Sequence, residues 1–471
     1  MGSKDIALMA HLMRRAGFGA PYEELEARVA KGYEATVEEL LDPERHGVPP
    51  LDTFLMYRYH PMNEIPGAPP YGSMNFMYYM LTTQRPLEEK LTLFWHMVFA
   101  TGNSKIDNPT EMNRQINMFR EHGLGNYRDL LMRLAKDPAM IFWLDNNMSH
   151  KHAPNENWGR ELLELFSLGQ GNYTEDDVKM ASRAFTGWTI KPKLPRAPYG
   201  RFLWQFEYRP EDHDDGEKEF LGQKGNFNGE DIIHIILQQP ATARFIARHL
   251  YSFFVADEVQ VPSWNDVAPR DPEAVQAIAD TFTKSDFDMK STLRFLFNSE
   301  FFKDEKVWFA KIKNPAEVVA GTTRLVGDFQ EPKPGVMLLT LEAGYQGQEL
   351  INPPSVEGWH TGSEWVDTGA LVRRVNFVAE MLGDASKPGV QSIINKLGSK
   401  DALSAEEVVD GCLELLGAIR VEDGTRRQLI DHVKAGGEVK RGSSEEQVRA
   451  FGQRVTEVLQ LIAATREYQF A

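Results

Sequence analysis

Apolar residues recur at helical spacing over most of this chain, and this period constrains its fold more than any other feature. Large β-forming residues gather instead in one region, Arg201–Tyr208, which Pro and Gly residues bound. We therefore predict a mainly α, multi-helix globular domain with a small β-hairpin insertion around residues 188–222. The clearest predicted helices are residues 11–16, 21–31, 33–41, 86–99, 230–238, 240–255, 271–284, 289–298, 404–418 and 444–466.

No stretch rich in Pro, Gly or Ser marks a boundary between domains, and no segment repeats. We expect residues 1–471 to form a single helical domain. Within it, residues 187–228 would hold the hairpin insertion and residues 385–471 a C-terminal helical region. Residues 42–71 are rich in Pro and Met and lack a period, which predicts a loop over the surface or beside a cleft.

Composition excludes several classes of protein. The 52 basic residues are outnumbered by 68 acidic ones, which argues against binding to nucleic acid or to anionic lipid. The apolar runs are far shorter than the roughly 20 residues that span a bilayer, so no membrane span is expected. The single Cys412 forms no internal disulfide and no multi-cysteine metal site. Any metal would be held mainly by His and carboxylates.

The N-terminus is charged too early for a secretory signal peptide, which predicts a cytoplasmic protein. A chain that had lost its signal peptide would look the same, so export stays open. No nucleotide-binding glycine loop, nucleophile elbow or zinc-binding HExxH helix occurs, which argues against the common kinases, dehydrogenases, α/β-hydrolases and zincins.

The segment Pro154–Gly169 divides its polar and apolar residues more sharply than any other. On a helix, its polar side chains fall within one arc of about 140°, opposite an apolar stripe. The polar arc is either a solvated surface with ion pairs at i, i+4 spacing, or a catalytic or metal-binding face. Its members are Glu156, Asn157, Arg160, Glu161, Glu164 and Ser167.

Several further blocks accompany this segment along nearly the whole chain. They are His11–Gly19, Phe94–His96 with Phe99–Thr101, Gly171–Val178, Arg183–Trp188, His213–Asp214 with Lys218 and Leu221–Gly222, Arg244–Ala247, and Pro353–Trp359. On these blocks the chain resembles the bacterial family called domain of unknown function 1800. Many members carry a second His two residues after the first in the second block, where this chain has Val98, which puts a His-pair site in doubt.

The resemblance implies kinship of fold but no reaction. It favours a polar face that lines a cleft, because the matching positions include the polar ones. In that case Arg160 would hold one carboxylate, and Glu161 or Glu164 would be left to act. The alternative is a buried, fully satisfied network that fixes helix packing. Family members are often encoded beside a sulfatase-like family, which implies a partner of that kind.

Other candidates lie outside this segment. Asp145 precedes a short loop and is placed either to meet the polar face of the next helix or to satisfy the turn. His213, between Asp212 and Asp214 and followed by Lys218, predicts an acid or anion-binding element or an ordinary acidic turn.

The block His11–Gly19 has two readings. Arg14 with Gly17–Gly19 suits an anion cradle, but Gly17 also fits an ordinary helix stop, with the arginines paired to acidic helices elsewhere; we favour the stop.

His96 predicts a satisfied core histidine. The block Pro353–Trp359 predicts a rigid turn that presents Glu357 and Trp359 at a surface.

Together these residues favour a hydrolase with a carboxylate- and His-lined cleft, acting on an anionic or hydroxylated, sugar-like substrate. Its catalytic candidates are Glu161, Glu164, Asp145 and His213, and its substrate-binding candidates are Arg160, Asn157, Arg14, Lys218 and Trp359. A divalent metal held by carboxylate and His is compatible with this set. The competing hypothesis is a non-catalytic binding or assembly protein that works with a sulfatase-like partner. The oligomeric state is not indicated.

Overall fold

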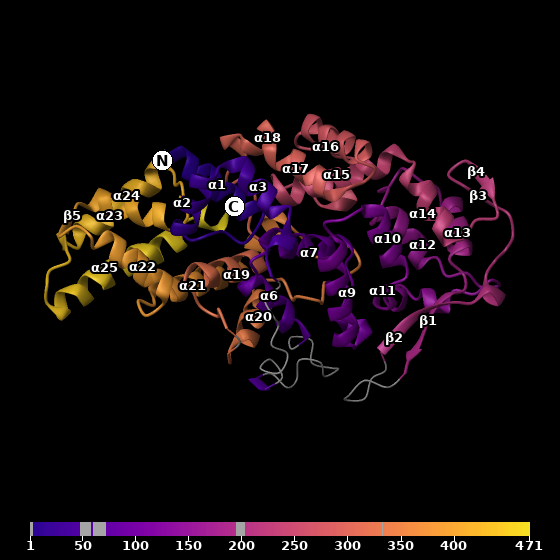
Figure 1. Ribbon diagram of the computed structural model, residues 1–471, viewed down its shortest axis with the longest axis horizontal. Coiled ribbons are helices and arrows are strands. Elements are labelled where there is room, and N and C mark those ends of the chain that lie inside the picture. Colours follow the sequence, from indigo (N-terminus) through magenta and orange to yellow (C-terminus); the bar gives the residue numbers. More distant parts are fainter. Residues whose placement is uncertain (1–2, 48–57, 60–71, 195–202, 332) are drawn as a thin grey trace.

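The computed structural model describes residues 3–47, 58–59, 72–194, 203–331 and 333–471. Helices dominate it, so the predicted mainly α fold is confirmed. Figure 1 shows an elongated body, with the C-terminal helices at one end and the strands β1–β4 at the other. The predicted loop at residues 42–71 lies largely outside the described residues.

The helices before residue 185 include those predicted at 21–31, 33–41 and 86–99, a first helix that begins earlier than the predicted 11–16, and several that were not predicted. Their bounds are α1 (Ser3–Arg15), α2 (Tyr22–Lys31), α3 (Tyr33–Leu40), α6 (Met74–Thr82), α7 (Pro86–Val98), α8 (Asn103–Ile106), α9 (Pro109–His122), α10 (Tyr127–Ala135), α11 (Pro138–Trp143), α12 (Asn157–Glu164) and α13 (Glu175–Ala184).

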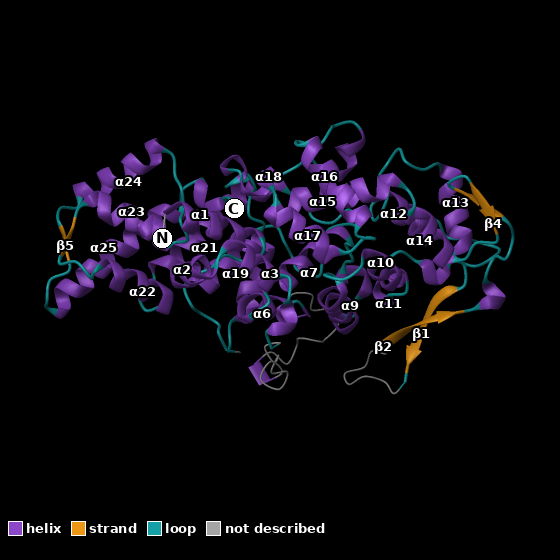
Figure 2. Cartoon of the chain, turned by 45° about the horizontal axis from the view of Figure 1, so that its top comes forward, coloured by secondary structure: helices purple, strands orange, loops and turns teal. Residues whose placement is uncertain are grey.

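The predicted hairpin insertion is present beside α13. Its strands β1 (Trp188–Lys193) and β2 (Leu203–Tyr208) pair antiparallel, with Trp188 opposite Tyr208. A second hairpin follows directly, made of β3 (Lys218–Phe220) and β4 (Gln223–Gly225). A third small sheet was not predicted: β5 (Ala402–Leu403) pairs with β6 (Val439–Lys440) near the far end of the molecule. Figure 2 shows how little of the chain these strands occupy.

Helices resume after the hairpins and continue to the end of the chain. They are α14 (Gly229–Leu237), α15 (Pro240–Phe254), α16 (Pro272–Lys284), α17 (Met289–Asn298), α18 (Glu300–Lys303), α19 (Pro315–Leu325), α20 (Val336–Tyr345), α21 (Thr368–Gly383), α22 (Pro388–Leu397), α23 (Ala405–Leu415), α24 (Asp423–Ala435) and α25 (Glu445–Ala463). Short 3-10 turns join several of them, including η4 (Val261–Asn265).

Two large apolar cores form, and α19 contributes to both. Val319 packs in the core built by the helices of the first two-thirds of the chain. Its neighbour Val318 packs in the core of the C-terminal helices. A helix buried on two faces has no polar stripe, which explains why the amphipathic pattern did not reveal α19.

Helix α7 is a buried helix that links distant parts of the chain. Its side chains are buried almost throughout, Lys90 and His96 included. Lys90 near its start lies beside the end of α1, and Met97 near its end meets the loop that follows α20. The helix therefore connects two regions in which charged groups gather.

Candidate functional site

Helix α12 packs closely on α13 and turns its polar face away. Trp158, Leu162 and Leu163 are buried. Gly159 makes the close approach possible, because a Cβ there would lie 2.6 Å from the Oγ of Ser182 on α13. The predicted division between the two faces therefore holds within α12, and packing against α13 fixes which way the carboxylates point. Ser167 departs from it: this residue lies beyond the helix, is buried and donates to the carbonyl of Leu162.

Glu161 is a half-buried carboxylate that has no hydrogen bond or ion pair among the residues described. Burial raises its pKa to about 7, and the negative charge of Glu164 adds to this effect. Arg160 opposes the shift and Glu357 reinforces it more weakly. Near neutral pH this group both holds and releases a proton.

The neighbours of Glu161 are occupied differently. Glu164 accepts hydrogen bonds from the Tyr173 hydroxyl at 2.9 Å and from the Gln170 amide at 2.5 Å. Arg160 does not hold either carboxylate, as the sequence suggested it would. It forks onto Glu175 at 2.7 and 2.8 Å, and its contact with Glu156 is longer, at 3.4 Å. The guanidinium thus leaves Glu161 without a partner.

Glu357 reaches this region from a loop almost 200 residues later in the chain. The loop is anchored at two points. Asn103 at the start of α8 donates its backbone N–H to Ile351, and Gly358 passes so close to Met97 that a Cβ would lie 2.6 Å from its carbonyl oxygen. Gly358 also has a φ of 87°, which favours glycine. Three sequence blocks, Phe94–Thr101, the α12 segment and Pro353–Trp359, therefore converge.

Two hollows lie near this convergence, and Glu161 and Glu164 line neither of them. One is a cavity of about 70 Å³ whose lining includes Glu357, Trp359, His249 and Trp264. The other is a groove of about 350 Å³ whose lining includes Asn172, just beyond α12, and again Trp264. Trp264 in η4 separates the two. Aromatic walls with a few convergent polar groups are typical of small-molecule sites.

Glu357, His249 and Trp264 were not among the predicted site residues. The matched block Pro353–Trp359 already contained Glu357, so its sequence offered a signal. His249 offered none: it lies between Phe245 and Trp264, with ring centroids 4.7 and 4.5 Å away. Burial lowers its pKa to about 3, so it is neutral.

Asp145 does meet the start of α12. Its carboxylate accepts a hydrogen bond from the Asn157 amide at 3.4 Å and pairs with Lys105 at 2.7 Å. Its backbone is left-handed, with φ 57°, which suits the turn leaving α11. The carboxylate therefore takes the first predicted role, at the helix face, and makes no side-chain cap hydrogen bond to the turn.

His213 and Lys218 lie apart from these carboxylates. The His213 ring is buried and bonds the carbonyl of Thr186 at 3.0 Å. Lys218 is buried too and donates to the carbonyls of Asp214 and Gly216; burial lowers its pKa. Asp214 pairs with Arg183. These contacts are those of a satisfied acidic turn.

The prediction made for Trp359 is wrong. It is only 5% exposed rather than presented at a surface, and it packs with Ile312 and Trp365. Its ring meets the edge of His96 at 5.2 Å. His96 is a core histidine, as expected, but neither ring nitrogen has a hydrogen-bond partner in the described chain, so it is not a satisfied one. Burial lowers its pKa to about 3.

The block His11–Gly19 ends α1, as expected. Gly19 has φ 82° and donates its N–H to Met13, which closes the helix. The expected pairing of its arginines with acidic helices is wrong. Arg14 donates to the carbonyl of Gly417 at 2.8 Å, and Arg15 to that of Val307 at 3.0 Å.

The described residues offer neither a cluster of metal ligands nor a membrane span. No group of three or more His, Cys, Asp or Glu side chains in those ranges is arranged to hold a metal ion. No helix within them is both long and apolar enough to cross a bilayer.

Comparison with curated proteins gives no match, and comparison with solved structures gives none either. A family model does match, over residues 11–470. It covers the α12 segment, the Pro353–Trp359 loop and the end of α1 alike. The chain therefore belongs to the family described as protein of unknown function DUF1800.

Proposed function

We propose that this protein is a hydrolase in which Glu161 is the general acid, acting on a hydroxylated, sugar-like substrate. The observation that carries the proposal is the unpaired Glu161 carboxylate, whose pKa of about 7 lets it donate a proton at neutral pH. A structural carboxylate at such a position would be expected to have a partner.

The second group of the reaction is a neighbouring carboxylate. Glu164 accepts hydrogen bonds from the Gln170 amide and the Tyr173 hydroxyl, which hold it in place. Glu357 approaches from the opposite element and lines the 70 Å³ cavity. Two neighbouring carboxylates are the pair that glycoside hydrolysis uses.

Binding would fall to the aromatic walls. Trp264 lies between the cavity and the groove, where a ring substrate could stack, and Arg244 and Asn172 add polar groups to the groove. The groove has room for a sugar ring, and the exposed Arg244 suits a substrate that also carries an anionic group.

The test is hydrolysis of chromogenic glycosides of neutral sugars and uronic acids. Glu161→Gln should lower kcat by about 10²- to 10⁴-fold, the usual contribution of a general acid. Glu156→Gln is the matched control, because Glu156 is a nearby glutamate that pairs with Arg160. The kcat of the Glu156→Gln protein should equal that of wild type. If Glu161→Gln retains wild-type kcat on every substrate that the protein cleaves, the assignment is wrong.

One observation favours the alternative of a binding or assembly protein. Leu338 and Tyr345 on α20 are 63% and 61% exposed, and their i, i+7 spacing puts them on one face. Exposed apolar faces often bind partners. A wild-type protein that neither cleaves nor binds any of the glycosides would favour this alternative.

A further inference from the structure

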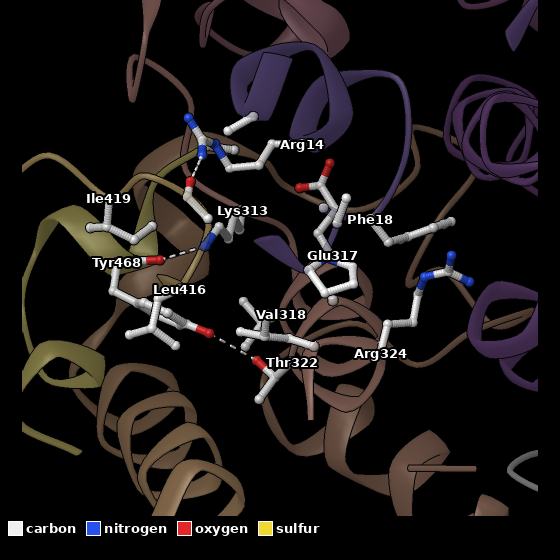
Figure 3. A pocket seen from close by; sticks show the side chains of 18 residues that line it. Arg14, Phe18, Lys313, Glu317, Val318, Thr322, Arg324, Leu416, Ile419 and Tyr468 are labelled. Atoms are coloured by element: carbon white, nitrogen blue, oxygen red, sulfur yellow. Dashed lines mark hydrogen bonds between the residues drawn. The ribbon is translucent and has the colours of Figure 1, made fainter. Parts of the chain in front are cut away.

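A second group of charges surrounds a cavity of about 60 Å³ between the two apolar cores. Its lining includes Phe18, just beyond α1, Val318 of α19, and Leu416 and Ile419 from the turn after α23. Three cations, Arg14, Lys313 and Arg324, also line it. Arg324 donates to the carbonyls of Met80, Leu81 and Thr83, which leaves Arg14 and Lys313 to be considered. Figure 3 shows both side chains on the same side of the cavity as Tyr468.

Arg14 has an unused edge. The residue is 8% exposed, and only its Nη1 is bonded, to the carbonyl of Gly417. Its Nε and Nη2 are buried and have no hydrogen-bond partner among the described residues. These two nitrogens form the fork of guanidinium that binds two oxygens of an anion side by side. The ring of Phe309 covers the group at 4.5 Å and holds it in place.

Lys313 lies without a carboxylate side chain as partner in the described residues. Its Nζ donates to the carbonyl of Tyr468 at 2.6 Å. Burial, with the positive charges of Arg14 and Arg374, lowers its pKa to about 7. Burial is the larger cause, because it disfavours the charged form of the amine, and the positive charges add to it.

The one carboxylate side chain that lines the cavity, among the residues described, is already used. Glu317 pairs with Lys90 and with Lys311, and it also accepts the backbone N–H of Asn314 at 2.7 Å. Burial would raise its pKa, but Lys311 and Lys90 outweigh burial and hold it at about 2. Glu317 therefore balances those two lysines, and no other side chain of the described lining compensates Arg14 and Lys313.

We propose that this cavity binds a small tetrahedral oxyanion of the phosphate or sulfate class. At about 10–15 Å³ for each water-sized group, the volume has room for about four such groups, which is one such ion. The donors for such an ion are the Arg14 edge, the Lys313 amino group, and the hydroxyls of Thr322 and Tyr468, which bond each other at 3.4 Å. The site is separate from Glu161 and does not rest on its proposed role.

The test is isothermal titration calorimetry of the full chain at constant ionic strength, with inorganic phosphate, sulfate and acetate titrated separately. Saturable binding of phosphate or sulfate is expected, with acetate much weaker. Arg14→Met and Lys313→Met should each weaken that binding by about 10- to 100-fold, as loss of a hydrogen bond to a charged group does.

Arg420→Gln is the matched control. Arg420 is close enough to Arg14 to lower its pKa, yet it is exposed, pairs with Glu305 and does not line the cavity. The affinity of the Arg420→Gln protein for phosphate or sulfate should stay within about twofold of that of wild type. The proposal is overturned if wild-type protein binds neither phosphate nor sulfate, if acetate binds as tightly, or if Lys313→Met, with an unchanged circular dichroism spectrum, binds as wild type does.

Discussion

The polar face of α12 and the cavity at the end of α1 both hold more charge of one sign than they have partners. Glu161 and Arg14 relieve this imbalance of charge in different ways. Glu161 is partly exposed and its pKa lies near 7, so it can take up a proton. Burial, with Arg15 and Arg420, lowers the pKa of Arg14 only to about 9, so its charge persists at neutral pH.

This difference separates two kinds of chemistry. A group that titrates near the working pH can transfer protons, and that is what acid catalysis requires. A group that keeps its charge under burial requires an opposite charge instead, from the protein or from a ligand. The same imbalance therefore suggests catalysis at α12 and anion binding near α1.

The largest expected effect comes from breaking the balance around the cavity. Glu317→Gln removes the one anion that Lys90 and Lys311 share, and it should destabilise the protein by about 3–5 kcal/mol. Urea unfolding at pH 7 measures this. Because the folded-state pKa of Glu317 is lowered, its stabilisation is present above about pH 4.5 and is lost as the pH falls toward 2. A loss of unfolding free energy as small as that of an exposed ion pair would contradict the buried network.

The opposite sign is expected at α12. The pKa of Glu161 is raised in the folded state, so folding is favoured when it is protonated, and stability falls as the pH rises from about 4.5 to 7. Glu161→Gln removes this loss. Its Tm should exceed that of wild type at pH 8 and approach it near pH 4. Equal Tm values at both pH values would show that Glu161 is not perturbed.

Two neighbours should move the pKa of Glu161 in opposite directions. Glu164→Gln removes a negative charge and should lower the pKa of Glu161. Arg160→Gln removes a positive charge and should raise that pKa. The pH at which stability changes in thermal unfolding reports both shifts. The Glu164 effect should be the larger, since Glu164 is the stronger influence. Shifts of the same sign would disprove the arrangement.

The smallest effect should come from Glu357→Gln, which lowers the pKa of Glu161 less than Glu164→Gln does. It is also the most informative, because it tests whether the Pro353–Trp359 loop faces α12 in solution. Glu349→Gln serves as control, since no interaction with Glu161 involves it. If the pKa of Glu161 is the same in the Glu357→Gln protein as in this control, the loop does not face α12 in solution.

Local features were predictable because neighbours in sequence decide them. Thr174 and Asp177, three residues apart, form the capping box at the start of α13. The stripe of α12 and the stop after α1 follow equally from residues within one or two turns. Helix α19 was not predicted, because its two buried faces belong to different cores.

The candidate site was only half predictable. Glu161 and Glu164 share a helix, so their spacing placed them on one face. Glu357 joins them only because Gly358 and Ile351 tie its loop to α7 and α8. Trp359 carried a misleading signal, because an aromatic residue in a turn gives no indication of what will cover it.

The sequence by itself determined many of the helical segments, where the hairpin beside α13 lies and which face of α12 is charged. Tertiary structure alone decided which charges find partners. Arg14 meets Gly417 across 403 positions of chain, and Arg160 turns to Glu175 and away from Glu161. Helix formation depends on contacts a few residues apart, whereas the pairing and burial of a charge depend on segments that only folding brings together.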